Sequence, residues 1–277
     1  MCRLFGLNSG HTRIRATFWL LDAPDSLEAQ SRRNVDGSGV GYFDPAGVPV
    51  IDKEPEPAFR DPDFLHAAKE CESETFVAHV RLASTGGRTM ANTHPFTMRG
   101  RVFAHNGGFG ELAKLEERLG GYRGLVKGDT DSERFFALIT KETDARGGDV
   151  TAGITAAATW VGANLPVAAL NIILAMPGEF WALRYPDQHA LHVLERPAKA
   201  GLTARSSMSS YQSDDLATAD SVLVASERLD GETGWRMLQP GELLHVKPDL
   251  SIESVIAVPD PPARLIPIGA GNPNIDT

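Results

Sequence analysis

The residue best suited to carry out chemistry in this sequence is Cys2, which directly follows Met1. If Met1 is removed, Cys2 carries both a thiol and a free α-amino group. The thiol titrates near 8.5 and the amino group at about 7.7–8.0, so both change charge close to neutral pH. An N-terminal amine can activate the nucleophile on its own side chain. The competing interpretation is a small buried hydrophobe at the start of a strand.

Two polar clusters could bind or polarise a substrate for such a nucleophile. Arg81 ends the apolar run of residues 75–81, and binding groups often emerge where strands end. Residues 105–108 contain Asn106 and Gly107, whose side-chain amide and backbone N–H can point two donors at one oxyanion. Taken singly, the first cluster also fits a surface ion pair, and the second fits a hairpin turn.

Two further clusters lie on either side of Asn106 in the sequence. Residues 92–96 contain Thr93 and His94 in a polar turn fixed by proline. Asp131 follows Thr130 in a capping-box pattern, which places its carboxylate in the first turn of a helix, where it could hold a substrate ammonium. The structural alternatives are an ordinary turn and a helix cap that complements the helix dipole.

Composition argues against nucleic acid and membranes as partners and against a disulfide-stabilised protein. A chain of 277 residues with net charge −9 lacks the basic surface that nucleic acid or an anionic membrane requires. The sequence offers neither an apolar run long enough to cross a membrane nor a signal peptide, so we expect a cytoplasmic protein. Two cysteines cannot build a disulfide scaffold. A Cys2–Cys71 bridge is formally allowed, but Cys71 is predicted to face the core from a helix.

Neither a nucleotide nor a metal site is expected. Residues 37–41 are rich in glycine but lack the dinucleotide-binding spacing, and a strand follows them instead of a helix. His189 and His192 fall across a turn, with no acidic or cysteine ligand near them in the sequence.

Strands and helices are predicted in blocks and not in strict alternation, which favours layered antiparallel sheets with helices outside them. One domain is expected over residues 1–258, followed by an extended or disordered tail over residues 259–277. Strands are predicted at residues 4–7, 37–43, 48–51, 75–81, 102–104, 167–176, 180–185, 191–194, 221–225 and 243–246. Helices are predicted at residues 26–33, 61–72, from 130 and around 154–165, with loops at residues 53–60 and 205–215.

In this order, the motifs resemble the class II glutamine amidotransferases, which are N-terminal-nucleophile hydrolases. The matching stretches are residues 1–6, 36–41, 78–81, 92–96, 105–107 and 128–133. The last three resemble the compact, stand-alone YafJ-like branch of the family, and the resemblance extends over about residues 1 to 250. Each motif is short and common, but six in the family's order behind a cysteine at position 2 are specific.

The resemblance implies an α+β fold, a four-layer αββα sandwich of two antiparallel sheets, with Cys2 at the end of a central strand. It implies that Cys2 attacks the side-chain amide of glutamine while Asn106 and Gly107 form the oxyanion hole. A γ-glutamyl thioester then forms, ammonia leaves, and water releases glutamate. No cofactor and no metal is implied.

The resemblance also implies how the amino-acid head of the substrate is held. Arg81 would bind the α-carboxylate and Asp131 the α-ammonium. Thr93 and His94 would line the glutamine pocket, through backbone groups. These contacts grip only the head group, so they fit glutamine and larger γ-glutamyl compounds alike.

Three functions remain open at this point. The first is a glutaminase that hands ammonia to a separate synthase subunit, and the second is a hydrolase of a larger γ-glutamyl compound. The third is a non-catalytic protein that binds a γ-glutamyl ligand or a partner. The presence of all five polar groups that the family's chemistry requires argues against the third.

Overall fold

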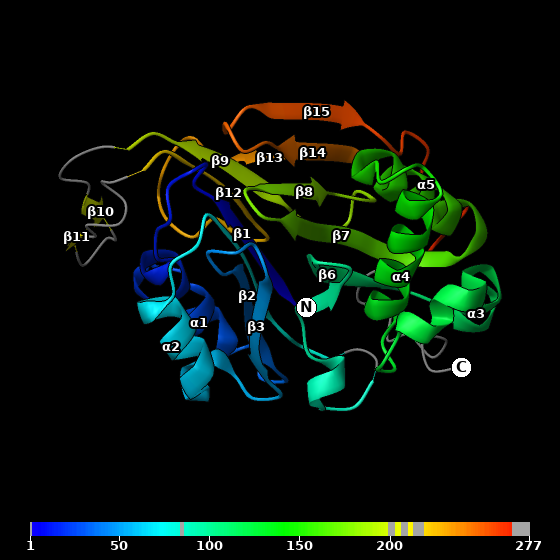
Figure 1. Ribbon diagram of the computed structural model, residues 1–277, viewed down its shortest axis with the longest axis horizontal. Coiled ribbons are helices and arrows are strands. Elements are labelled where there is room, and N and C mark those ends of the chain that lie inside the picture. The colour runs from blue at the N-terminus through cyan, green and yellow to red at the C-terminus, as the bar shows by residue number, and fades with distance from the viewer. Residues whose placement is uncertain (1, 84–85, 199–202, 206–209, 213–218, 268–277) are drawn as a thin grey trace.

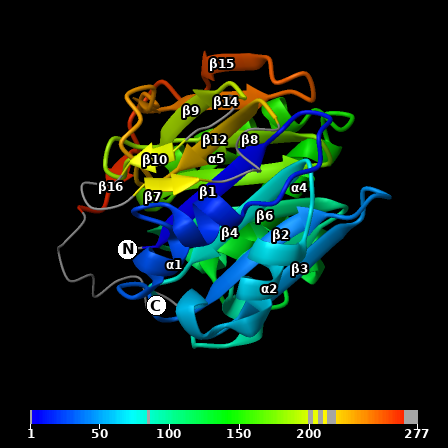
Figure 2. The ribbon, with the colours of Figure 1, turned by 90° about the vertical axis from the view of Figure 1, so that its left-hand side faces the viewer.

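Two stacked sheets with helices on both outer faces form the protein, as a computed structural model shows (Figure 1). The structure describes residues 2–83, 86–198, 203–205, 210–212 and 219–267. In Figure 1, α1 and α2 lie on the left, α3, α4 and α5 on the right, and the strands between them. Figure 2 shows α1 and α2 in front of the sheets and α5 behind them. The predicted αββα sandwich is confirmed.

The first sheet places β1 at its centre. Within the described residues, its strands in spatial order are β13 (Arg236–Met237), β9 (His192–Arg196), β12 (Ser221–Ala225), β1 (Arg3–Asn8), β4 (Thr75–Val80), β2 (Ser38–Phe43) and β3 (Pro49–Glu54). Each neighbouring pair is antiparallel. The central place of β1 positions the start of the chain between two well-supported neighbours.

The second sheet carries the asparagine and glycine motif on β6. Its strands in spatial order are β15 (Ile252–Ile256), β14 (Glu242–Val246), β8 (Glu179–Leu183), β7 (Pro166–Met176), β6 (Arg101–Phe109) and β5 (Phe96–Met98). A short strand, β16 (Arg264–Leu265), pairs in parallel with β7. β10 (Thr203–Arg205) and β11 (Ser210–Gln212) form a separate small pair.

Helices cover the outer face of each sheet. They are α1 (Leu27–Ser31), α2 (Pro62–Glu70), α3 (Leu112–Leu119), α4 (Asp131–Asp144) and α5 (Val150–Asn164), with short π- or 3₁₀-helical turns at Phe18–Asp22, Ala58–Arg60, Met90–Asn92 and Gly120–Leu125. Caps set two of the starts: Ser26 Oγ accepts from Ala29 N, and Asp61 Oδ1 accepts from Phe64 N.

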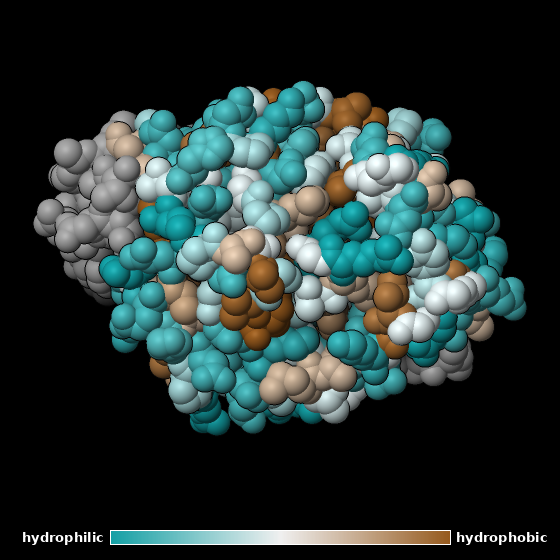
Figure 3. Space-filling model, in the orientation of Figure 1, coloured by the Kyte–Doolittle hydropathy of each residue, from teal (hydrophilic) through white to brown (hydrophobic). Residues whose placement is uncertain are grey.

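Three buried apolar clusters hold the layers together. One lies between the sheets and includes Leu4, Val77 and Ile173. The other two lie between each sheet and its helices, one around Trp19 and the other around Phe135. Burial of this apolar surface is the main favourable contribution to folding. The exterior is mostly hydrophilic in the view of Figure 3, with hydrophobic side chains over β15, where Val255 and Ile256 are exposed.

Several predicted boundaries need correction. Residues 53 and 54, expected in a loop, extend β3, because Lys53 pairs with Gly39 of β2. Cys71, predicted inside a helix, caps the end of α2 and is half-buried, with its thiol donating to the Tyr42 hydroxyl at 3.2 Å. Both cysteines are free thiols.

Two predictions touch residues that the structure describes only in part. The expected loop at residues 205–215 includes strand residues of β10 and β11, and its remaining positions lie outside the described residues. The domain boundary at residue 258 stays a prediction. Beyond it, residues 259–267 include β16, and residues 268–277 lie outside the described part of the chain.

Candidate active site

Cys2 directly precedes β1, so the central strand fixes its position. Its Sγ donates to Leu82 O over 3.3 Å, and Leu82 N approaches the sulfur at 3.4 Å. Burial raises the pKa of the Cys2 thiol, while the contact with Leu82, the charge of the N-terminus and the Arg81 guanidinium lower it. Cationic neighbours favour the thiolate, which is the attacking form of cysteine.

Arg81 follows the last residue of β4 and is buried. Its backbone N donates to Gly37 O at 2.8 Å, which ties it to the start of β2. Its guanidinium donates to Gly87 O at 3.2 Å and to Gly86 O at 3.1 Å. These bonds fix the guanidinium, whose charge acts on the Cys2 thiol.

Asn106 faces β1 across the space between the sheets. Its Nδ2 donates to Ser226 Oγ at 3.5 Å, and the same oxygen accepts from Leu4 N at 3.0 Å. Ser226 N donates in turn to Leu4 O at 3.1 Å. Ser226 therefore connects the strand that begins at Cys2 with the amide of Asn106. The contact restrains the Asn106 side chain with its Nδ2 toward Ser226 Oγ.

Gly107 lies within a strand and not in a turn. The prediction that the strand of residues 102–104 ends before Asn106 is wrong, because β6 pairs with β7 in continuous register as far as Gly108 and ends at Phe109. A Cβ on Gly107 would lie 1.9 Å from Ala169 O, so only glycine allows this approach. A register shift after Gly108 then bends β6, as bulges often do beside active sites.

Asp131 is the first residue of α4 and is buried. Its Oδ2 accepts from Phe109 N at 3.2 Å, and its Oδ1 accepts from Ser132 N at 2.8 Å. Thr130 caps the helix as predicted, because its Oγ1 accepts from Glu133 N at 3.2 Å. The helix N-terminus favours a negative charge at this position.

Only half of the predicted capping box forms. The Glu133 carboxylate accepts from Lys127 N at 3.0 Å and from Gly128 N at 2.6 Å, in place of Thr130 N. These bonds hold residues 127–128 close to Asn92, whose Oδ1 accepts from Asp129 N at 2.8 Å. The start of α4 is thereby joined to the chain that leads into Thr93.

Thr93 and His94 enter a turn that ends in the cis peptide bond between His94 and Pro95. We call residues 93–95 the 93–95 turn. Thr93 Oγ1 donates to Thr89 O at 2.9 Å. A Cβ on Gly37 would lie 3.1 Å from Thr93 Cγ2, so the turn lies beside the residue that binds Arg81 N.

The His94 ring is buried between two other rings. Its centroid lies 4.2 Å from that of His79 and 4.5 Å from that of Phe96. Burial lowers the pKa of His79 to about 3 and the pKa of His94 well below its usual range. Both rings are therefore neutral at pH 7, and His94 borders the turn as a packing group.

The predicted site residues gather at one end of the sandwich. Cys2 and Arg81 share contacts with the segment after β4, and the Asp131 charge acts on both of them. Asn106 reaches β1 through Ser226. The arrangement brings together a thiol, a cation, an anion and an amide donor.

Two residues that contact the predicted site residues are not predicted from the sequence. Ser226 contacts Asn106, and Lys53 contacts Thr93. Ser226 directly follows a strand, as Arg81 does, and the same positional signal could have identified it. Lys53 was assigned to a loop, although its spacing of two from Ile51 puts both on one face of a strand.

Within the described residues, no group of histidine, cysteine and acidic side chains could hold a metal ion. The helices of the same residues include none with the length and apolarity to span a membrane.

Comparison with known proteins places the chain in a family. A family model described as glutamine amidotransferases class-II matches residues 1–260. The probable glutamine amidotransferase DUG3 of Saccharomyces cerevisiae is 31% identical over 150 residues, which is 50% of this chain but 41% of that protein's length. The gamma-glutamyl-hercynylcysteine sulfoxide hydrolase of Mycobacterium tuberculosis is 28% identical over 257 residues, covering 89% of this chain and 93% of the relative.

A solved structure agrees on the fold. Glutamine phosphoribosylpyrophosphate amidotransferase from B. subtilis superposes with a TM-score of 0.65 at 18% identity, covering 94% of this chain and 50% of that one. Because the family model matches nearly the whole described chain, this protein belongs to the class II glutamine amidotransferases.

Proposed function

We propose that this enzyme hydrolyses the side-chain amide of glutamine, with Cys2 as an N-terminal nucleophile. The observation that carries the proposal is the position of Cys2 at the start of the central strand, next to Leu82 and Arg81. Removal of Met1 would free the α-amino group of Cys2. That amine, directly or through a water molecule, would take the thiol proton.

The reaction proceeds through two acyl transfers. The sulfur forms a bond to the amide carbon, and the carbonyl oxygen becomes an oxyanion that accepts from Asn106 Nδ2 and Gly107 N. The C–N bond then breaks, and the amine's proton goes to the departing nitrogen, which leaves as ammonia. Water attacks the γ-glutamyl thioester, the C–S bond breaks, and glutamate leaves with Cys2 restored.

The head of the substrate would be held at both of its charges. Arg81 is assigned to the α-carboxylate and Asp131 to the α-ammonium, with Thr93 and His94 forming the wall beside them. Support comes from the fixed positions of the two charged groups, which are buried and bonded to backbone. Burial and fixed partners reduce the entropy that such groups lose when substrate binds.

A second candidate is hydrolysis of a larger γ-glutamyl compound, in which an amine other than ammonia leaves. It is favoured by the mycobacterial relative, a named γ-glutamyl hydrolase that aligns over nearly all of both chains. The proposed contacts to the amino-acid head suit both candidates. For the first candidate, a separate synthase subunit that receives ammonia is the expected partner, and a cytoplasmic location fits two free thiols.

The test is glutamate release from glutamine, glutathione and other γ-glutamyl amides, with Cys2→Ala as the matched control. Wild type should release glutamate from at least one of them, and Cys2→Ala should not. The preferred amide identifies the leaving group. If wild type and Cys2→Ala behave alike on every amide, the proteins are binding modules and the proposal is wrong.

A further inference from the structure

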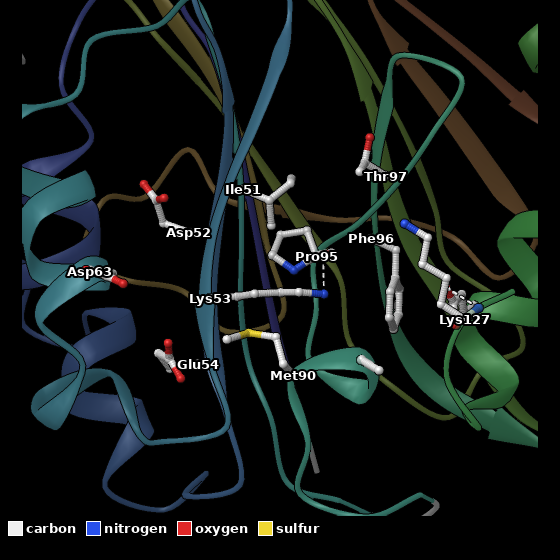
Figure 4. A pocket seen from close by; sticks show the side chains of 12 residues that line it. Ile51, Asp52, Lys53, Glu54, Asp63, Met90, Pro95, Phe96, Thr97 and Lys127 are labelled. Carbon is white, nitrogen blue, oxygen red and sulfur yellow. Dashed lines mark hydrogen bonds between the residues drawn. The ribbon is translucent and has the colours of Figure 1, made fainter. Parts of the chain in front are cut away.

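Lys53 lies outside the predicted site but hydrogen-bonds to the 93–95 turn, which is the proposed wall of the glutamine pocket. Lys53 lies on β3, and its Nζ donates to Thr93 O at 2.6 Å and to Pro95 O at 3.2 Å. These carbonyls flank His94, so one ammonium group spans the 93–95 turn. Figure 4 shows the Lys53 side chain crossing from β3 to Pro95.

The local backbone brings Lys53 and the turn together. Lys53 pairs with Gly39 of β2, and a Cβ on Gly39 would lie 2.3 Å from His94 O and 2.7 Å from Lys53 Cβ. The turn therefore packs directly on the bare backbone of β2. This close approach puts the turn's carbonyls within reach of a side chain from the next strand.

The turn has few other polar anchors. The buried His94 ring makes no hydrogen bond among the described residues, and it packs against the rings of His79 and Phe96. Thr93 is tied to the residues before it, through its N–H to Met90 O and its hydroxyl to Thr89 O. The two bonds from Lys53 join the turn to another sheet, and hence to the strands that carry Cys2 and Arg81.

Lys53 makes these bonds without an acidic partner. Within the described residues it forms no ion pair, and Glu133, the acid that acts on its charge, is bonded to Lys127 N and Gly128 N. Figure 4 shows Asp52 and Glu54 on the opposite side of β3. Lys53 is half-buried, and a partly desolvated cation without a counter-ion costs stability. Such a cost is expected where a residue serves a purpose other than folding.

Beside Lys53 lies a cavity of about 620 Å³, bordered also by Met90, Phe96, Lys127 and Glu133. The Lys53 Nζ lies 5.0 Å from the centre of the Phe96 ring, an additional contact for the cation. Lys53 itself borders this cavity and is only half-buried, so its amine can exchange protons with solvent.

We propose that Lys53 is a positioning residue, whose bonds to Thr93 O and Pro95 O hold the 93–95 turn in the place where it meets the substrate. The inference rests on the proposed function, because it takes that turn as the wall of the γ-glutamyl pocket. Lys53 does not touch the reacting atoms. Its loss should weaken binding of the substrate head more than it slows bond breaking.

The pH dependence follows from the surroundings of Lys53. Burial lowers the pKa of Lys53 to about 8, with Glu133 raising it and Lys127 lowering it further. The other charged groups that border the cavity, Asp52, Glu54 and Asp63, lie toward α2 (Figure 4). Above pH 8 the neutral amine donates weaker hydrogen bonds than the ammonium, so the KM for substrate should rise there.

The test compares Lys53→Met, Lys53→Arg and the control Lys69→Met in steady-state hydrolysis of the best γ-glutamyl amide. Lys69 is an exposed lysine on α2 that does not border the cavity. Lys53→Met should raise KM about tenfold, which corresponds to 1.4 kcal/mol, with kcat within about twofold. Lys53→Arg should recover part of the loss and Lys69→Met should resemble wild type. The rise of the wild-type KM above pH 8 should be absent in Lys53→Met. An unchanged KM, or an equal loss in Lys69→Met, would overturn the inference.

A binding measurement separates failure of the inference from failure of the proposed function. L-Glutamine and glutathione are titrated calorimetrically into Cys2→Ala and into Cys2→Ala/Lys53→Met. Weaker binding to the double variant supports the role of Lys53 even if wild type hydrolyses neither compound. Equal binding to both variants contradicts the role of Lys53, whereas no binding to either contradicts the proposed function on which that role rests.

Discussion

At the scale of single residues, the least expected contact is the one between Ser226 and Asn106. The Ser226 hydroxyl accepts from Asn106 Nδ2 and from Leu4 N, so it links the proposed oxyanion donor to the strand that begins at Cys2. Removal of an oxyanion donor itself costs about 10²–10³ in kcat. Loss of a group that only orients the donor should cost less.

We therefore expect Ser226→Ala to lower kcat about tenfold and to leave KM nearly unchanged, because the oxyanion exists only after attack. Ser221→Ala is the matched control, since Ser221 is buried on the same β12 segment. The measurement is kcat and KM for both variants, with circular dichroism to verify folding. A kcat for Ser226→Ala that equals that of Ser221→Ala would show that the contact does not orient Asn106.

At the scale of elements, β2 packs closely on the 93–95 turn, which is the proposed wall of the substrate pocket. Gly39→Ala would place a methyl group 2.3 Å from His94 O, which is backbone and cannot rotate away. We expect a loss of about 1–3 kcal/mol in the free energy of unfolding and a raised KM, because the turn must shift.

Gly124→Ala is the control, since a Cβ there meets nothing within 4 Å. Urea unfolding and steady-state kinetics measure the two effects. If Gly39→Ala is as stable as Gly124→Ala, the 93–95 turn does not pack on β2 closely enough to exclude a methyl group at position 39.

The elements also define what sequence patterns can predict. Caps and apolar periodicity identified α2, α4 and α5, because those signals are local. The passage of β6 through Asn106 and Gly107 depends on pairing with β7, more than 60 residues later in the chain. An asparagine followed by glycine is typical of a turn, and only the distant partner strand overrides that preference. Lys53 differs, because its partner Gly39 lies in the same predicted hairpin, and the acidic and proline residues that follow Lys53 indicate a loop.

At the scale of the whole molecule, the depressed pKa of Lys53 links stability to pH. Burial lowers this pKa from 10.5 to about 8 in the folded protein. Between these values the unfolded chain binds more protons at Lys53, so this residue makes stability rise with pH. Below pH 8 the folded protein carries the full cost of the buried charge, at most about 3 kcal/mol.

Lys53→Met removes that titration. We expect the difference in free energy of unfolding between wild type and Lys53→Met to move in favour of wild type between pH 8 and 10. Urea unfolding of both proteins across this range measures the trend. A constant difference would mean that Lys53 titrates at its ordinary value in the folded state.

The central claim is that the sandwich presents Cys2 as an N-terminal nucleophile. The order of the motifs along the sequence indicated this role, and the structure places Cys2 beside Arg81 with Asn106 linked to the same strand. The chemistry needs both a free α-amino group and a sulfur that becomes acylated.

The most direct test is peptide mass spectrometry of the purified enzyme, quenched in acid during turnover of its best γ-glutamyl amide. The account predicts that the N-terminal peptide begins at Cys2 and carries a γ-glutamyl group on its sulfur. An active enzyme that retains Met1, or that carries the γ-glutamyl group on another residue, would contradict it.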